Sequence, residues 1–344
     1  MSLGPLMIDV AGLELTAADR ELLASPAVGG VILFTRNYAS REQLTALTEA
    51  IHSLRTPPLI VAVDHEGGRV QRFRSGFTVL PNARLIGRQY DIDADLGRAL
   101  AEDVGYLMAS ELLECGVDLS FAPVLDLARG VSEVIGDRAF HRDPEIVGTL
   151  GQSWVAGMRA AGMAGVAKHF PGHGAVVADS HVALPVDRRF FEDIEEDIAP
   201  FARLVRADVP AIMMAHVVYP AVDPLPASLS KRWIDELLRR RLDFRGVVFC
   251  DDLSMAGAAV VGDTLARARH ALDAGCDVLL VCNDRPASEI LAEALAGRSD
   301  PLGQVRLARM HGRGPEATAD AARRAQAVER IARLQDSPSL QLNA

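Results

Sequence analysis

The chain has 344 residues, of which 49% are hydrophobic and 24% charged, a composition typical of a globular protein with a large core. Its formal net charge is -10 and it contains no long Lys/Arg block, which argues against a nucleic-acid-binding protein. The N-terminus lacks a charged segment followed by a long apolar run, and no stretch of about eighteen apolar residues occurs, so we expect neither secretion nor a membrane span.

Eight short apolar runs are predicted to be β-strands. They are apolar at both odd and even positions, as expected for strands of a parallel sheet that is covered on both faces. In chain order the runs are PLMIDV (5–10), GGVILF (29–34), LIVAVD (59–64), VDLSFAPV (117–124), MAGVAKHF (163–170), AIMMAHV (211–217), GVVFCDD (246–252) and DVLLVC (277–282).

Helical patterns lie between these strands and begin after residues that commonly cap helices, namely Thr16, Ser40, Asp143 and Ser230. Glycines occur near the returns from helix to strand, at positions 29, 116, 162, 246 and 275. Eight strand–helix units favour an α/β fold of the (β/α)8 TIM-barrel type, with an open doubly wound sheet as the alternative. No GxGxxG or GxxxxGK[ST] loop follows any strand, so the sequence gives no dinucleotide or P-loop signature.

We expect one catalytic domain over residues 1–344, with the barrel at about 5–297 and a helical tail at about 298–344. The tail combines many alanines with Arg323, Arg324, Arg330 and Arg333 and is predicted to form amphipathic helices packed outside the barrel. A partner-binding helix is the alternative. The four cysteines show no CxxC spacing, and three of them lie in apolar runs. Buried thiols in a reducing cytoplasm are therefore expected, with a disulfide or thiolate metal site as the alternative.

Polar residues at the carboxyl ends of the predicted strands mark the candidate active site, because barrel enzymes place their chemistry there. A strand end can also be a solvated end or a helix cap, so the set is more informative than any one member. The set comprises Asp9, Asp64, Asp126, Lys168, His169, His216, Asp251 and Asp252.

The segment DHEGGRVQR (64–72) places an acid at a strand end, followed by two glycines that allow a sharp turn and then by two arginines. Carboxylate and guanidinium groups side by side suit the hydroxyl groups of a sugar. For Asp64, Glu66 and Arg69, an ion pair that braces the loop is the alternative.

The segment KHFPGHGAVVADSH (168–181) concentrates three of the nine histidines. Pro171 and two glycines disfavour regular structure, so residues 171–183 are expected to form a loop at the catalytic face. In an extended segment Asp179 and His181 point the same way, so the carboxylate could orient the imidazole as a general acid/base. A zinc site using His169, His173, His181 and a strand-end Asp competes with this interpretation. His173 could also simply satisfy backbone groups of the loop.

The segment CDDLSM (250–255) ends the seventh strand with two acids, either of which could be a nucleophile or general base. Periodicity does not choose between Asp251 and Asp252, because both faces of the strand are apolar. One is expected to face the site and the other to cap the following helix.

Taken together, DHEGGRVQR, IGDRAFH, KHFPGHG with DSH, and FCDDLSM resemble the single-domain β-N-acetylglucosaminidases of glycoside hydrolase family 3, bacterial cytoplasmic enzymes of peptidoglycan recycling. The resemblance extends from residue 5 to about residue 290. His65 stands where relatives often have Gln, and Cys250 where they often have Ser.

The resemblance implies that Asp251 is the nucleophile, that His181 is the acid/base and that Asp179 is its partner. It also implies that N-acetylglucosamine is held by Asp64, Arg72, Arg138, Lys168 and His169. The implied enzyme is a retaining hydrolase that removes terminal N-acetylglucosamine from GlcNAc-1,6-anhydroMurNAc peptides.

No cofactor or metal is expected, and the expected partner is a small-molecule muropeptide rather than nucleic acid or membrane. The sequence leaves the natural aglycone and the oligomeric state open, and a monomer is the working expectation. A metal-dependent hydrolase on the same barrel and a catalytically silent sugar-binding protein are the alternative functions.

Overall fold

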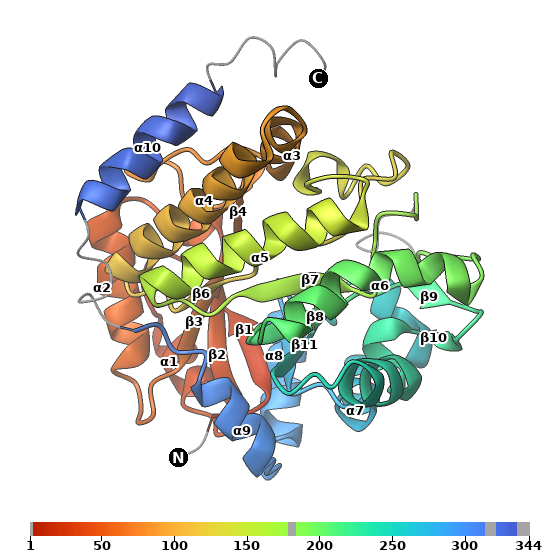
Figure 1. Ribbon diagram of the computed structural model, residues 1–344. Coiled ribbons are helices and arrows are strands. Elements are labelled where there is room, and N and C mark those ends of the chain that lie inside the picture. Colours follow the sequence, from red (N-terminus) through yellow and green to blue (C-terminus); the bar gives the residue numbers. More distant parts are fainter. Residues whose placement is uncertain (1–2, 178–183, 314–320, 336–344) are drawn as a thin grey trace.

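The structure is a computed structural model that describes residues 3–177, 184–313 and 321–335. Eight parallel strands form one sheet in the order β6-β3-β2-β1-β12-β11-β8-β7 (Figure 1). The strands are β1 (Leu6–Asp9), β2 (Val28–Leu33), β3 (Ile60–Val63), β6 (Leu119–Ser120), β7 (Val166–Phe170), β8 (Ala211–Met214), β11 (Val247–Cys250) and β12 (Val278–Val281). Each lies within one of the eight predicted runs or begins one residue before it.

The sheet closes into a barrel between its two ends, β6 and β7. The chain just after β6 runs parallel to β7, with a bridge between Val124 and Lys168. The backbone N–H of Val166 donates to the carbonyl of Ala122 at 2.8 Å, and the N–H of Leu125 donates to the carbonyl of Lys168 at 2.7 Å. The predicted TIM-type barrel is therefore confirmed, and the open sheet is not.

Helices surround the barrel (Figure 1). They are α1 (Ala17–Leu23), α2 (Arg41–His52), α3 (Ala83–Ile92), α4 (Ala94–Glu114), α5 (Pro144–Ala161), α6 (Phe191–Arg206), the π-helical segment η4 (Arg232–Arg241), α7 (Thr264–Ala274) and α8 (Arg285–Ala294). Three of the four predicted caps are observed, because Thr16, Ser40 and Asp143 accept hydrogen bonds from the backbone N–H groups of the first turn. Ser230 lies one residue before the N-cap position of η4, which is Lys231, although its hydroxyl accepts the N–H of Trp233 at 3.3 Å.

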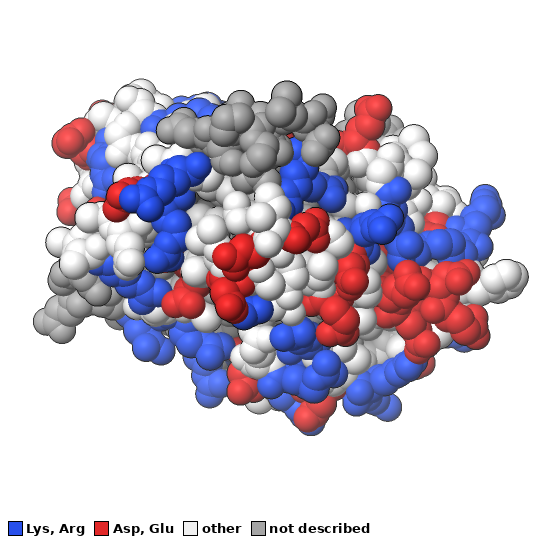
Figure 2. All heavy atoms as spheres, turned by 45° about the horizontal axis from the view of Figure 1, so that its top comes forward, with Lys and Arg blue, Asp and Glu red and all other residues white. Residues whose placement is uncertain are grey.

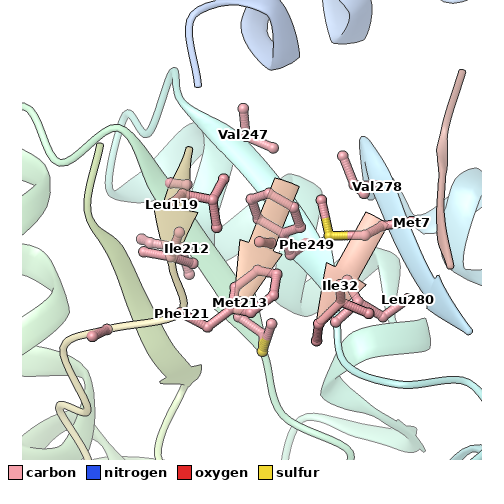
Figure 3. Close-up of a cluster of buried hydrophobic side chains, with 14 of the residues drawn as sticks. Met7, Ile32, Leu119, Phe121, Ile212, Met213, Val247, Phe249, Val278 and Leu280 are labelled. Carbon is pink, nitrogen blue, oxygen red and sulfur yellow. The ribbon is translucent and has the colours of Figure 1, made fainter. Parts of the chain in front are cut away.

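The barrel interior is filled with side chains rather than open (Figure 3). Alternate residues of a strand, such as Val247 and Phe249 in β11, are buried there together with residues from the other strands. Phe121 and Phe249 pack edge to face with ring centroids 5.3 Å apart. In barrels with such a packed core, active sites lie at the carboxyl ends of the strands.

Short elements decorate the carboxyl ends of several strands. Sequence patterns did not predict them. They are the hairpin of β4 (His65–Gly67) and β5 (Val70–Gln71), the hairpin of β9 (Val218–Tyr219) and β10 (Asp223–Pro226), and the 3-10 turns η1 (Thr35–Asn37), η2 (Gly136–Arg138), η3 (Ala227–Leu229) and η5 (Ala256–Val261).

The tail contributes α9 (Pro301–Ala308) and α10 (Ala321–Gln335) outside the barrel, as predicted. The apolar face of α10, with Ile331 buried, packs along α4. Arg323 pairs with Glu102 on α4 at 2.8 Å, and Arg330 pairs with Asp103. None of the helices in the described ranges is long and apolar enough to cross a membrane. In Figure 2, acidic and basic side chains are interspersed over the face shown.

Candidate active site

A cavity of about 310 Å³ lies among the segments that follow the carboxyl ends of the strands. Asp64 follows β3, Lys168 and His169 belong to β7, and Asp251 follows β11. Six of the residues implied by the family resemblance lie in the described ranges, and all six line this cavity: Asp64, Arg72, Arg138, Lys168, His169 and Asp251. Of the other strand-end candidates, Asp252 lines it too, whereas Asp9, Asp126 and His216 do not. Asp9 instead pairs with Arg36 and accepts the N–H of Asn283. Asp179 and His181 lie outside the described residues.

Five charged side chains form an alternating chain of cations and anions along one wall. The Arg138 guanidinium donates to both Glu66 carboxylate oxygens, with Nε–Oε2 and Nη2–Oε1 distances of 2.8 Å each. Lys168 Nζ lies 2.5 Å from Glu66 Oε1 and 2.7 Å from Asp64 Oδ1. Arg72 Nη2 lies 3.6 Å from Asp64 Oδ2. The chain runs from a buried end at Arg138 and Glu66 to an accessible end at Arg72, whose side chain is 32% exposed.

Glu66 and Arg138, at the buried end of this row of charged side chains, stay ionised. Burial by itself would raise the pKa of the Glu66 carboxyl, but Arg138 and Lys168 hold that pKa well below its usual range. Burial likewise opposes the charge of Arg138, yet Glu66 raises the pKa of its guanidinium above the usual value. Both groups are therefore charged throughout the range in which the protein would work.

His169 is held by a second buried acid. Its Nδ1 lies 2.7 Å from Asp126 Oδ2, and Asp126 Oδ1 also accepts the backbone N–H of His173 at 2.6 Å. Burial would raise the pKa of Asp126, but His169 and His173 hold it below its usual value. An anionic carboxylate only accepts hydrogen bonds, so Nδ1 of His169 carries the proton and Nε2 is the ring atom left for a ligand.

The two acids after β11 have different surroundings. Asp252 accepts from the backbone N–H groups of Ser254 and Cys282, both at 3.0 Å, and from the Ser254 hydroxyl at 2.7 Å. Its carboxylate therefore fastens the turn after β11 to the end of β12. Asp251 lines the cavity, with Oδ1 accepting the N–H of Asp252 at 2.8 Å. Asp252 also lines the cavity, and its carboxylate binds a turn rather than the first turn of a helix, so the expected division between a site-facing acid and a helix-capping acid is not observed.

His216, which is fully buried, binds the backbone carbonyl of Asp252. His216 Nε2 lies 2.9 Å from the carbonyl oxygen of Asp252, and its Nδ1 lies 2.6 Å from the Ser228 hydroxyl. Because a carbonyl only accepts, Nε2 carries the proton and Nδ1 accepts from Ser228. His216 thus supports the strand end without lining the cavity.

The turn at Gly67 and Gly68 requires glycine. Both residues have positive φ, 92° and 55°, and a Cβ on Gly67 would lie 2.4 Å from the Pro81 carbonyl oxygen. Arg69, which follows the turn, donates to the carbonyls of Glu133 and Val134 and pairs with Asp137 at 3.1 Å. Arg69 is therefore a loop brace, which is the alternative that the sequence had left open.

Sequence reasoning missed the importance of Glu66. It is buried between two site cations, whereas the sequence suggested only a loop ion pair. Glu66 lies two residues after Asp64, so in an extended segment the two acids face the same side. That spacing was the signal that could have identified it.

Within the described ranges, no group of three or more His, Cys, Asp and Glu side chains is arranged to hold a metal ion. The His169 and His173 ring centroids are 6.0 Å apart. The alternative zinc site also requires His181, which lies outside the described residues. All four cysteines are buried and free of disulfides, as predicted.

The family follows from comparison with known proteins. Residues 6–306 match the model of the glycosyl hydrolase family 3 N-terminal domain. The chain belongs to glycosyl hydrolase family 3. It is 57% identical over 348 residues to a beta-hexosaminidase of Thioalkalivibrio sulfidiphilus, with 100% of both chains covered, and 54% identical to that of Thiobacillus denitrificans, with 100% of this chain and 98% of the relative covered.

Solved structures give the same result for this family 3 hydrolase. It superposes on native NagZ from Neisseria gonorrhoeae with a TM-score of 0.92 and 44% identity, covering 98% of this chain and 99% of that one. The same enzyme in complex with N-trifluoroacetyl-D-glucosamine gives a TM-score of 0.93. The protein is therefore a glycoside hydrolase of the beta-hexosaminidase type, as the sequence resemblance predicted.

Proposed function

We propose that this hydrolase is a retaining, exo-acting β-N-acetylglucosaminidase that removes terminal N-acetylglucosamine from GlcNAc-1,6-anhydroMurNAc peptides. The observation that carries the proposal is the position of Asp251 at the wall of a small cavity that is also lined by the alternating charges. A volume of about 310 Å³ is near the lower limit for small-molecule sites, about 300 Å³, which favours a single sugar unit. The N-trifluoroacetyl-D-glucosamine complex of the gonococcal relative supports an N-acylated amino sugar.

In the proposed mechanism, Asp251 attacks the anomeric carbon while His181 protonates the glycosidic oxygen that leaves. A covalent glycosyl–Asp251 ester forms and the aglycone departs. His181 then removes a proton from water, which attacks the anomeric carbon and releases the sugar with net retention. Asp179 orients His181 and stabilises its protonated form.

The sugar is proposed to be held by Asp64, Arg72, Arg138, Lys168 and His169. Asp64 can accept hydrogen bonds from sugar hydroxyls, because its side chain is 21% exposed at the accessible end of the charge chain. Lys168 and Arg138 can donate to oxygen atoms of the sugar, and His169 can present Nε2.

The proposed context is a cytoplasmic monomer without cofactor or metal. Four buried cysteine thiols suit a reducing compartment. We propose further that the chain is one catalytic domain, with the barrel over about 5–297 and the tail over about 298–344. Fractionation of the producing cells and light scattering of the purified protein test the location and the monomer.

The first test is hydrolysis of p-nitrophenyl β-N-acetylglucosaminide and β-glucoside by the wild type and by His181→Ala. We expect preference for the N-acetyl substrate. The variant should lose most of its activity. The loss should be smaller for a glycoside whose leaving group is p-nitrophenol than for one with a poor leaving group, because an activated leaving group needs little protonation. Equal losses with both leaving groups would argue against His181 as the acid.

The nucleophile is tested by trapping. A 5-fluoro-N-acetylglucosaminyl fluoride slows both steps because fluorine destabilises the oxocarbenium-like transition state, and its good leaving group still lets the ester accumulate. Mass spectrometry of the digested protein should place the added sugar on Asp251. Label on another residue would reassign the nucleophile.

A further inference from the structure

We infer that Glu66 is a positioning residue of the sugar site, because this one buried carboxylate fixes the orientation of both Arg138 and Lys168. The inference rests on the proposed function, in which these two cations bind the sugar. It assigns to Glu66 no contact with the reacting atoms.

Glu66 lies between Arg138 and Lys168 and binds both. Arg138 is bound through Nε and Nη2, and Lys168 is bound by the same Oε1 atom that accepts Arg138 Nη2. The three residues come from β4, η2 and β7, and Arg138 lies 72 positions after Glu66 in the sequence. Glu66 is 7% exposed, Lys168 2%, and the Arg138 side chain 12%, so water screens these contacts little. One carboxylate therefore joins a barrel strand, β7, to two segments that cover the barrel face.

Glu66 also decides which N–H groups remain for a sugar. A guanidinium has five N–H donors, and Arg138 uses Nε and one on Nη2 for Glu66 and one on Nη1 for the Val134 carbonyl, which leaves two. An ammonium has three N–H donors, and Lys168 directs two of them at Glu66 and Asp64, which leaves one. The directions of these remaining donors are set by the bonds to Glu66.

Charge balance makes the carboxylate necessary. Among the described residues, Glu66 is the acid that forms an ion pair with Arg138. Without its negative charge, two buried cations would face each other across the gap that the carboxylate now fills. Breaking one partner of a buried charge pair leaves the other uncompensated, so the cations would move toward solvent or toward Asp64.

The support of Glu66 is rigid. Its strand β4 pairs with β5 across the Gly67–Gly68 turn, which admits no other residue without strain. Gln71 on β5 donates to the carbonyls of Phe73 and Thr78 and accepts the N–H of Leu80. A carboxylate on such a fixed hairpin can impose an orientation on flexible Lys and Arg side chains.

The test compares Glu66→Gln, which keeps the shape but removes the charge, with the matched control Asp277→Asn. Asp277 is also buried and also holds two cations, with Arg239 at 2.7 Å and Arg306 at 2.9 Å, but it precedes β12 at the opposite end of the barrel. For each protein we would measure the inhibition constant of free N-acetylglucosamine, the kcat and KM for the p-nitrophenyl glycoside, and the midpoint of thermal unfolding.

We expect Glu66→Gln to weaken N-acetylglucosamine binding by about 10- to 100-fold, the size associated with hydrogen bonds to charged groups. Asp277→Asn should lower the unfolding midpoint but leave the inhibition constant within about twofold of the wild type. If Glu66→Gln behaves like Asp277→Asn, losing stability with unchanged sugar binding, Glu66 is only structural and the inference is wrong.

If Glu66→Gln does not fold, the same sugar-binding measurement on Glu66→Asp tests the inference. It keeps the charge but is one methylene shorter, so it cannot hold both cations in the same places. Weaker sugar binding in the folded Asp variant supports the inference, and wild-type binding overturns it. A wild-type protein that neither cleaves the glycoside nor binds the sugar would instead refute the proposed function.

Discussion

Asp126 shows how a residue that need not touch the substrate can set the chemistry of the site. Its carboxylate fixes both the proton on His169 Nδ1 and the backbone of His173. Asp126→Asn removes a charge-assisted hydrogen bond, and we expect sugar binding about 10- to 100-fold weaker. The measurement is the inhibition constant of N-acetylglucosamine together with the 15N chemical shifts of the His169 ring. Unchanged shifts would show that Asp126 does not select the tautomer.

Metal dependence is also decided at the scale of residues. Among the residues that the structure describes, no group of three or more His, Cys, Asp and Glu side chains is arranged to hold a metal ion, and the proposed reaction uses a carboxylate and an imidazole without an ion. We therefore expect full activity after dialysis against excess EDTA. Activity that is lost with EDTA and restored by zinc would favour the metal-dependent hydrolase instead.

Part of the site could be predicted from the sequence, because several of its residues lie at the ends of strands that short stretches of sequence reveal. Asp64, Lys168, His169 and Asp251 follow or end recognisable strands, and the barrel rule brings strand ends together. The bond between Glu66 and Arg138 was not predictable, because it joins residues 72 positions apart and depends on how two loops fold over the barrel. Arg138 itself was found only through the family resemblance.

At the scale of elements, α4 and α5 approach closely because each supplies a glycine at the contact. A Cβ on Gly157 would lie 2.0 Å from the Glu102 carbonyl oxygen, and one on Gly105 would lie 2.2 Å from that of Trp154. We expect Gly157→Ala to lower the free energy of unfolding by about 1–3 kcal/mol, since the helices must separate.

The matched control is Gly297→Ala, because a Cβ at this exposed position meets no atom within 4 Å. It should leave stability within about 0.5 kcal/mol of the wild type. Urea unfolding measures both variants. A Gly157→Ala protein as stable as the control would mean that the helix pair adjusts without cost.

The elements that the sequence revealed were those long enough to show a pattern. The eight strands and the caps at Thr16, Ser40 and Asp143 follow from apolar runs and from N-cap chemistry. The hairpin β4–β5 has strands of three and two residues, too short for any periodicity. Its geometry comes from the contact of its glycines with residues 80–82, which the sequence alone does not reveal.

At the scale of the whole molecule, Asp118 connects several parts at the N-terminal end of the barrel. Its carboxylate accepts the N–H of Val61 in β3, at 2.8 Å, and the N–H of Gly312 in the tail, at 3.0 Å. Its Oδ2 also lies 3.0 Å from Nε2 of His52, the last residue of α2. Burial alone would raise the pKa of Asp118, but the hydrogen bonds with His311, His52 and Val61 lower it to about 2.

This pKa fixes the sign of a pH effect on stability. The folded-state pKa lies below the unfolded value of about 3.9, so the stabilisation is complete above that value and is lost as the pH falls through about 2. Lowering the pKa from about 3.9 to about 2 corresponds to about 2.6 kcal/mol of stabilisation at neutral pH, of which about 0.4 kcal/mol remains at pH 2, where the folded-state carboxyl is half protonated. We expect the free energy of unfolding of the wild type to exceed that of Asp118→Asn at pH 6, and the difference to shrink by about 2 kcal/mol at pH 2.

Urea unfolding at the two pH values measures this difference. The contributions of the other carboxylates to the pH dependence cancel, because both proteins contain them. Asp95→Asn is the control, since the Asp95 side chain is 88% exposed and should leave the pH dependence of the wild type unchanged. If Asp118→Asn keeps the same difference from the wild type at both pH values, ionisation of Asp118 does not stabilise the fold. Its role would then be limited to interactions that do not require its negative charge, and the contacts that it makes with the barrel and the tail would be independent of charge.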